Sequence, residues 1–219
     1  MIPSMVIPVG GRVSRVSIDG WIADVACAHP VAGVAVAGAA RRLAETLVAA
    51  SVGVAPDGVR VAALLPSGRP VAMSAAGPMP VSVSVSHDRT IAGAAVSSAA
   101  RVGIDIVDPR TVCSALDTWF RNDERSTIPQ AEYHGDAFTT EWRACLWSAK
   151  EAAYKAASLD VPFAPLAVAI IPGAGDRFHF TVQGSVRDVS GSGRCFIAGR
   201  YVVALAVVGS VEVEDGACS

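Results

Sequence analysis

The stretch Val-Gly-Ile-Asp-Ile at residues 102–106 predicts a buried β-strand that carries one carboxylate, Asp105. Downstream, the stretch Trp-Ser-Ala-Lys-Glu-Ala-Ala-Tyr-Lys at residues 147–155 predicts a helix on which Glu151 and Lys155 share one face. Mg²⁺ takes few protein ligands and keeps places for water and phosphate oxygens, and a lysine neutralises phosphate as a point charge. The two stretches therefore indicate a site for a divalent cation and a pyrophosphate.

Each part of this site has an ordinary structural alternative. A Glu followed by a Lys at i+4 is a favourable pair on any helix surface, worth about 0.2–0.5 kcal/mol. Trp147, on the same stripe as Glu151, favours a partly covered face over a fully solvated one. Asp105 could instead be a buried carboxylate bonded to backbone N–H groups, since an unpaired buried charge is costly. Gly103 beside it would let another backbone or a ligand approach closely.

The strictly alternating Val-Ser segment at residues 81–86 is the clearest predicted strand, and it delivers His87 to its end. A turn at residues 88–90 would pair it with a strand at residues 91–97. Further strands are expected at residues 20–27, 59–65, 102–107, 167–171, 177–182, 195–198 and 201–208. Helices are expected at residues 37–50, 113–120, 123–128 and 136–157, with a turn at residues 66–70. These elements favour an α+β fold with an N-terminal lobe at residues 1–100 and a C-terminal lobe at residues 101–219.

Composition excludes several classes of protein. The chain has 219 residues, of which 52% are hydrophobic and 17% charged, so it is globular rather than disordered. A net charge of -2 predicts no nucleic-acid or anionic-membrane partner. The most apolar stretch, residues 25–40, contains a His and a Pro and is shorter than the ~20 residues of a bilayer span. We therefore expect a cytoplasmic protein. Its five scattered cysteines predict neither a disulfide framework nor a zinc site.

The two stretches resemble the signature of the Sfp-type 4′-phosphopantetheinyl transferases. That signature is (Val/Ile)-Gly-(Ile/Val)-Asp, followed downstream by (Trp/Phe)-(Ser/Thr/Cys)-x-Lys-Glu-(Ala/Ser)-x-x-Lys. Residues 102–105 and 147–155 agree with it at every position and look like its Trp/Lys-Glu-Ala subgroup. Ser-His at residues 86–87 and Gly-Arg-Pro at residues 68–70 are similar to the family's Ser-His strand end and Gly-Lys-Pro turn.

The resemblance implies two similar α/β lobes related by a pseudo-twofold axis, with coenzyme A in the cleft between them. It implies a monomeric, Mg²⁺-dependent enzyme that transfers the phosphopantetheine arm of coenzyme A to a serine of an acyl or peptidyl carrier protein. Adenosine 3′,5′-bisphosphate would be released. Carriers of fatty-acid, polyketide and non-ribosomal peptide synthesis remain open alternatives.

The family's functional residues carry over to matching positions of this chain. Asp105 and Glu151 would hold Mg²⁺ against the pyrophosphate. Glu151 would also help to deprotonate the carrier serine, and Lys155 would stabilise charge on the transferring phosphate. His87 would act in both catalysis and binding. The residues that would contact coenzyme A are Arg41, Arg69, Ser86, His87, Lys150 and Lys155.

The chain departs from the family pattern just after its first motif. Many members have a third acid where this chain has Val107. Strand alternation points Asp108 to the opposite face, so we expect water in the third metal position. Arg42 could exchange roles with Arg41, and residues 110–125 are a candidate surface for the carrier. The alternative functions are a coenzyme A- or carrier-binding protein that has lost turnover, and a structural α+β protein with an ordinary Glu–Lys pair.

Overall fold

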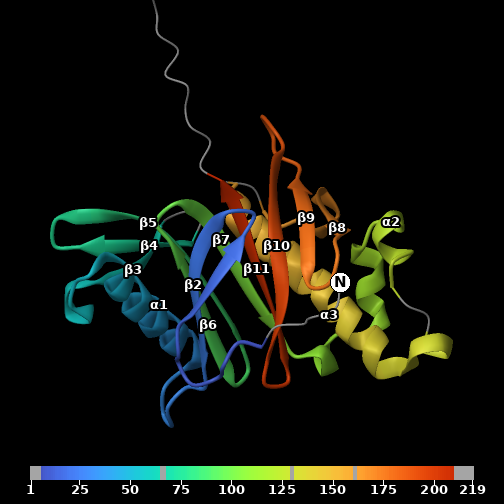
Figure 1. Ribbon diagram of the computed structural model, residues 1–219, viewed down its shortest axis with the longest axis horizontal. Coiled ribbons are helices and arrows are strands. Elements are labelled where there is room, and N and C mark those ends of the chain that lie inside the picture. The colour runs from blue at the N-terminus through green and yellow to red at the C-terminus, as the bar shows by residue number, and fades with distance from the viewer. Residues whose placement is uncertain (1–5, 65–67, 129–130, 160–161, 210–219) are drawn as a thin grey trace, which may run out of the picture.

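The computed structural model describes residues 6–64, 68–128, 131–159 and 162–209, and it contains two antiparallel sheets (Figure 1). The strands of the first sheet are β1 (Ser14–Ile18), β2 (Trp21–Ala28), β3 (Arg60–Leu64), β4 (Arg69–Ser74), β5 (Gly77–Asp88) and β6 (Ile91–Ser97). The strands of the second sheet are β7 (Ala100–Val107), β8 (Val168–Pro172), β9 (Arg177–Val182), β10 (Val189–Ala198) and β11 (Tyr201–Gly209). The helices are α1 (Val36–Val52), α2 (Asn122–Arg125) and α3 (Ala131–Ala157), with short 3₁₀ turns at Pro56–Gly58, Pro109–Thr111, Ser114–Trp119 and Pro165–Ala167.

The chain follows the same path through each of the two sheets, apart from β1. In the first, β2 leads into α1 and then into β3, β4, β5 and β6, and the spatial order is β1-β2-β6-β5-β4-β3. In the second, β7 leads through α2 and α3 into β8, β9, β10 and β11, and the spatial order is β7-β11-β10-β9-β8. Apart from β1, which adds an outer strand, each lobe places its first strand beside its last. The expected α+β fold of two similar lobes is therefore confirmed.

The elements stack as helix, sheet, sheet and helix (Figure 1). Leu47 and Val48 of α1 pack with Val83 and Val96 on the outer face of the first sheet. The helix α3 covers the outer face of the second sheet through a row of alanines and Leu146. A third cluster joins the inner faces, where side chains of β6 and β7 meet those of β2 and β11. In the described parts of the chain, no helix is long and apolar enough to cross a membrane.

Most predicted elements are present with shifted ends, and the strands at residues 91–97 and 177–182 agree at both ends. The sequence pattern misses β1, and it also misses β4, which begins inside the predicted turn at residues 66–70. The first two residues of that turn, and the last of the strand expected at residues 59–65, lie outside the described residues. The long helix begins earlier than expected, and β10 extends the strand expected at residues 195–198 toward the N-terminus.

The strand β7 lies at the edge of its sheet, although a largely apolar strand of this kind is typical of the centre of a sheet. One side of β7 pairs with β11. On the other side, alternate backbone N–H groups donate to serine hydroxyls of β5 from the other lobe, at 3.0–3.2 Å. These bonds are Val102 N–H to Ser82, Ile104 N–H to Ser84, and Ile106 N–H to Ser86. We call the three serines the serine ladder. It satisfies the edge of β7 and joins the two lobes.

Candidate active site

Asp105 and Lys155 form the centre of the site. The Lys155 Nζ atom lies 2.7 Å from Asp105 Oδ1 and also donates to the Ile104 carbonyl at 3.1 Å. The Ser86 hydroxyl donates to the same Asp105 oxygen at 2.9 Å. Asp105 is buried, and these bonds come from side chains of α3 and β5. The buried carboxylate thus has a charged and a polar side chain as partners. The sequence alone does not decide between such partners and backbone N–H groups.

Glu151 brings a second carboxylate to this centre. It lies one turn before Lys155, with Nζ 3.7 Å from Glu151 Oε2, and both side chains are about one-third exposed, at 30% and 29%. Burial and, second, the negative charge of Asp105 raise the pKa of Glu151, the positive charge of Lys155 opposes them, and the resulting pKa is about 7. The Glu151–Lys155 pair is therefore half-buried, and its lysine also contacts Asp105, unlike an ordinary surface Glu–Lys pair.

The close approach of α3 to β7 depends on Gly103. A Cβ atom at this position would lie 1.9 Å from the Ala152 carbonyl oxygen and 2.6 Å from the Ala156 backbone nitrogen. Only a residue without a side chain fits such a contact. Because Ala152 and Ala156 adjoin Glu151 and Lys155, this packing brings the side chains of Glu151 and Lys155 within reach of Asp105.

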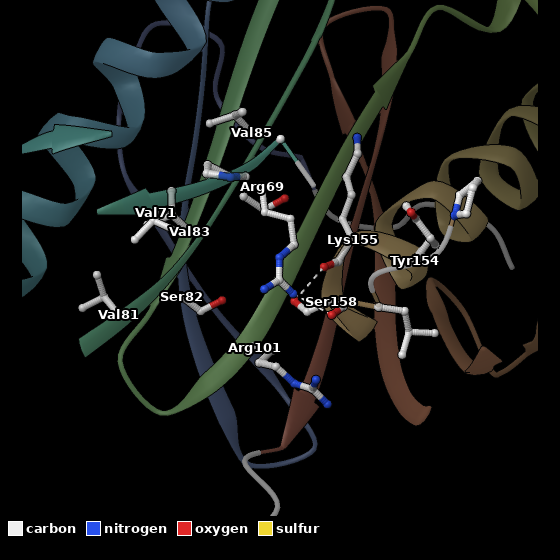
Figure 2. A pocket seen from close by; sticks show the side chains of 15 residues that line it. Arg69, Val71, Val81, Ser82, Val83, Val85, Arg101, Tyr154, Lys155 and Ser158 are labelled. Carbon is white, nitrogen blue, oxygen red and sulfur yellow. Dashed lines mark hydrogen bonds between the residues drawn. The ribbon is translucent and has the colours of Figure 1, made fainter. Parts of the chain in front are cut away.

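Two pockets meet at Lys155. The larger, of about 820 Å³, lies between the lobes, where Arg69 and the strand β5 face Arg101 and the end of α3 (Figure 2). The smaller, of about 410 Å³, is lined by Ser86, His87, Asp105, Trp147 and Glu151 as well as Lys155. The ammonium group of Lys155 therefore lies where a long ligand in the larger pocket would reach the two carboxylates.

Arg69, Ser86 and His87 are brought to these pockets from the first lobe, as the motif matches predict. Arg69 Nη1 donates to the Ser158 carbonyl at 2.6 Å across the cleft (Figure 2). His87 is exposed at the end of β5 and lines the smaller pocket. The three residues therefore line the same inter-lobe region as the two carboxylates.

Lys150 is not brought to the site, which corrects the expectation that it contacts a phosphate. Its side chain is completely buried, and Nζ lies 2.7 Å from Oε2 of the equally buried Glu124. It also donates to the carbonyls of Pro165, at 3.0 Å, and Val168. Burial lowers the pKa of Lys150, and the bond to Glu124 opposes that shift. Lys150 thus ties α3 to α2 and β8 on the side of the helix that faces the core.

Arg41 and Arg42 also lie apart from the site. Both are exposed on α1, and neither belongs to the residues that line the two pockets. An exposed position on the outer helix of the first lobe gives no contact with a ligand held between the sheets. The expected phosphate contact of Arg41 is therefore not supported by its position.

Arg101 is a pocket residue that sequence reasoning misses. It lies near the start of β7 and lines the larger pocket (Figure 2). Its Nη1 atom donates to the Ala157 carbonyl at 2.9 Å. Burial lowers its pKa, as do the positive charges of Arg187 and Arg69. The available signal is a basic residue directly before the Val-Gly-Ile run of this strand.

Val107 occupies the position at which many family members have a third acid, and Asp108 follows it. Val107 lines the smaller pocket, whereas the carboxylate of Asp108 is held by Arg110 at 2.6 Å and Arg200 at 3.2 Å. These contacts lower the pKa of Asp108 to about 2, chiefly through the hydrogen bond from the Arg110 side chain. Asp108 is therefore engaged in ion pairs and is not among the residues that line the smaller pocket.

The donor set fits a magnesium ion. Within the described residues, no cluster of three or more His, Cys, Asp or Glu side chains could hold a metal. Burial and, second, the negative charge of Asp105 raise the pKa of Glu151, and a divalent cation between the two carboxylates would stabilise their charged forms. Mg²⁺ is commonly bound by one or two carboxylates together with water and substrate phosphates. Asp105 and Glu151 meet that requirement.

Residues 101–206 match the family model of the 4′-phosphopantetheinyl transferase superfamily. The matched region runs from β7 into β11 and includes Asp105, Glu151 and Lys155. No curated protein matches the chain at a significant level. The second lobe and the centre of the site are thus similar to this superfamily, a finding that is independent of the geometry.

Proposed function

We propose that the chain is an Sfp-type 4′-phosphopantetheinyl transferase. It transfers the phosphopantetheine arm of coenzyme A to a serine of an apo acyl or peptidyl carrier protein and releases adenosine 3′,5′-bisphosphate. The observation that carries this proposal is the contact of Asp105 and Glu151 with Lys155 at the junction of the two pockets. The match of residues 101–206 to the transferase superfamily supports it.

The larger pocket takes coenzyme A in this proposal, and its cations hold the phosphates. Arg69 and Arg101 line the cleft, and Lys155 faces the pyrophosphate at the centre. Arg101 takes the place in the binding set that sequence reasoning gives to Arg41. His87 lies at the smaller pocket, where the carrier serine must enter, and contacts the same phosphates from the first lobe.

The reaction is a phosphoryl transfer, in which positioning and charge stabilisation matter most. The carrier serine oxygen forms a bond to the phosphorus that bears the pantetheine arm. The bond from that phosphorus to the bridging oxygen breaks, and adenosine 3′,5′-bisphosphate leaves. Glu151, directly or through a water molecule, accepts the proton of the serine hydroxyl. Lys155 stabilises charge on the transferring phosphate, and Mg²⁺ held by Asp105 and Glu151 would neutralise the leaving pyrophosphate oxygens.

Replacement of Glu151 by Gln tests the enzyme against a binding protein without turnover. We expect Glu151→Gln to slow transfer by at least about 100-fold, because a positioned base contributes that much or more, while coenzyme A still binds by calorimetry. Glu141→Gln, an exposed substitution on the same helix, should leave transfer unchanged. Unaltered transfer by Glu151→Gln would contradict the proposed role of this carboxylate.

A further inference from the structure

Ser86 differs from the other two members of the serine ladder. Ser82 and Ser84 accept backbone N–H groups of β7, at 3.0 Å each. Ser86 accepts the Ile106 N–H in the same way, at 3.2 Å, and its own hydroxyl donates to Asp105 Oδ1 at 2.9 Å. The last hydroxyl of the ladder thus reaches from the first lobe to a carboxylate of the second.

The number of hydrogen bonds that a hydroxyl can donate limits what Ser86 can do. A serine hydroxyl has a single proton to donate. In this structure that proton is used on Asp105, while the oxygen accepts from Ile106 and lies 3.4 Å from Lys155 Nζ. A phosphate oxygen only accepts hydrogen bonds, so a direct bond from Ser86 to coenzyme A would require the bond to Asp105 to break.

We propose that Ser86 is a positioning residue that orients Asp105 for a divalent cation, and that it is not a direct ligand of the coenzyme A phosphates. The inference rests on the proposed function, because it concerns the same metal site. Ser86 and Lys155 hold one oxygen of the carboxylate from opposite lobes, which fixes its rotation. Groups that orient a metal ligand in this way typically change metal affinity by about 10- to 100-fold when they are removed.

The first test is metal binding without coenzyme A. Mn²⁺ titrations of the full chain, followed by electron paramagnetic resonance, give the dissociation constant directly. We expect Ser86→Ala to raise it by about 10- to 100-fold, and Ser86→Thr, which keeps the hydroxyl, to stay near wild type. Ser84→Ala is the matched control, because it removes a ladder bond of similar length that touches no carboxylate. It should leave Mn²⁺ affinity unchanged.

The second test is coenzyme A binding in the presence of chelator. If Ser86 only positions the metal ligand, Ser86→Ala should bind coenzyme A as tightly as wild type under these conditions. If Ser86 contacts a phosphate directly, Ser86→Ala should bind coenzyme A more weakly. Thermal melts by circular dichroism check the fold of each variant. If Ser86→Ala does not fold, Ser86→Cys, whose thiol is a weak donor, replaces it.

Weakened coenzyme A binding by folded Ser86→Ala in chelator would overturn the inference, and so would any of three results of the Mn²⁺ titrations. Equal losses of Mn²⁺ affinity in Ser86→Ala and Ser84→Ala would show that the ladder acts only as structure. Unchanged Mn²⁺ affinity in Ser86→Ala would show that Asp105 needs no positioning by this residue. Absence of Asp105-dependent Mn²⁺ binding by the wild-type chain would remove the inference together with the metal role. Transfer of the phosphopantetheine arm is assayed separately, so the first two results leave the proposed function standing.

Discussion

Two lysines five residues apart on α3 have different surroundings. Lys155 is partly exposed between the pockets and pairs with Asp105, whereas Lys150 is fully buried against Glu124. The i, i+4 spacing of Glu151 and Lys155 makes their shared face predictable from sequence. The partner of Lys150 lies on a different helix, far away in the chain, and no local periodicity can reveal it. This explains why Asp105, Glu151 and Lys155 are correctly grouped from sequence and Lys150 is not.

Replacement of Lys150 by Met should therefore affect stability and not binding. Removal of one partner of a buried ion pair leaves an uncompensated charge and costs about 3–5 kcal/mol. We expect Lys150→Met to lower the free energy of unfolding by that amount in urea titrations, with coenzyme A affinity unchanged at temperatures where it is folded. Lys155→Met is the comparison, and it should abolish transfer at a smaller cost in stability. Weakened coenzyme A binding by a fully folded Lys150→Met protein would contradict this assignment.

Asp108 should make stability depend on pH. Its pKa is about 2 in the folded chain, below the value of about 3.9 for an unfolded aspartate. A lowered carboxylate pKa stabilises the fold above the unfolded value, and this contribution is lost as pH falls from about 4 toward 2. We expect Asp108→Asn to cost about 1–2 kcal/mol at pH 7, since both arginine partners are more than half exposed.

Urea titrations between pH 7 and pH 3 measure this difference. The difference in free energy of unfolding between wild type and Asp108→Asn should become smaller below about pH 4. The matched substitution Asp57→Asn, at an exposed residue, should change stability little at any pH. A gap that stays constant down to pH 3 would show that the ion pairs of Asp108 do not stabilise the fold.

At the scale of elements, the contact of α3 with β7 places the site. Gly103 is the residue at which this contact is closest. The sequence indicates a close approach at Gly103, but it does not say whether a ligand or a backbone is the neighbour. The structure shows that it is the backbone of α3. The alternating polar face of β5 is likewise recognisable as part of a strand, yet its serines bond to β7, a contact between lobes that periodicity cannot show.

A methyl group at Gly103 should displace α3. Its carbon would lie 1.9 Å from a backbone carbonyl oxygen, and no side-chain rotation can relieve that overlap. We expect Gly103→Ala to lower stability by about 1–3 kcal/mol or more and to reduce transfer, because Glu151 and Lys155 move with the helix. Gly38→Ala, in α1 with its nearest neighbour 4.0 Å away, is the control and should be neutral or stabilising. Wild-type activity in Gly103→Ala would contradict the role of this packing.

The whole molecule repeats one chain path twice, and the site lies at the junction of the repeats. The order of strands in the two sheets is the same apart from β1, although no sequence repeat marks it. A sheet and the helix that covers it must each bury an apolar face. This requirement fixes which positions are hydrophobic more than which residue stands at each position, so two lobes can share a topology without similar sequences. From sequence, the two lobes and the motif residues are predictable. The inter-lobe serine ladder and the position of Arg101 require the tertiary structure.

Intact-mass spectrometry of an apo carrier protein, incubated with the chain, coenzyme A and Mg²⁺, tests the central claim most directly. The account predicts that the carrier gains the mass of one phosphopantetheine arm, and that chelator or Asp105→Ala prevents the gain. Apo carriers from fatty-acid, polyketide and peptide synthesis serve as parallel substrates. An unchanged mass for every carrier, with a folded protein that binds coenzyme A, would contradict the proposed transferase and favour a binding protein.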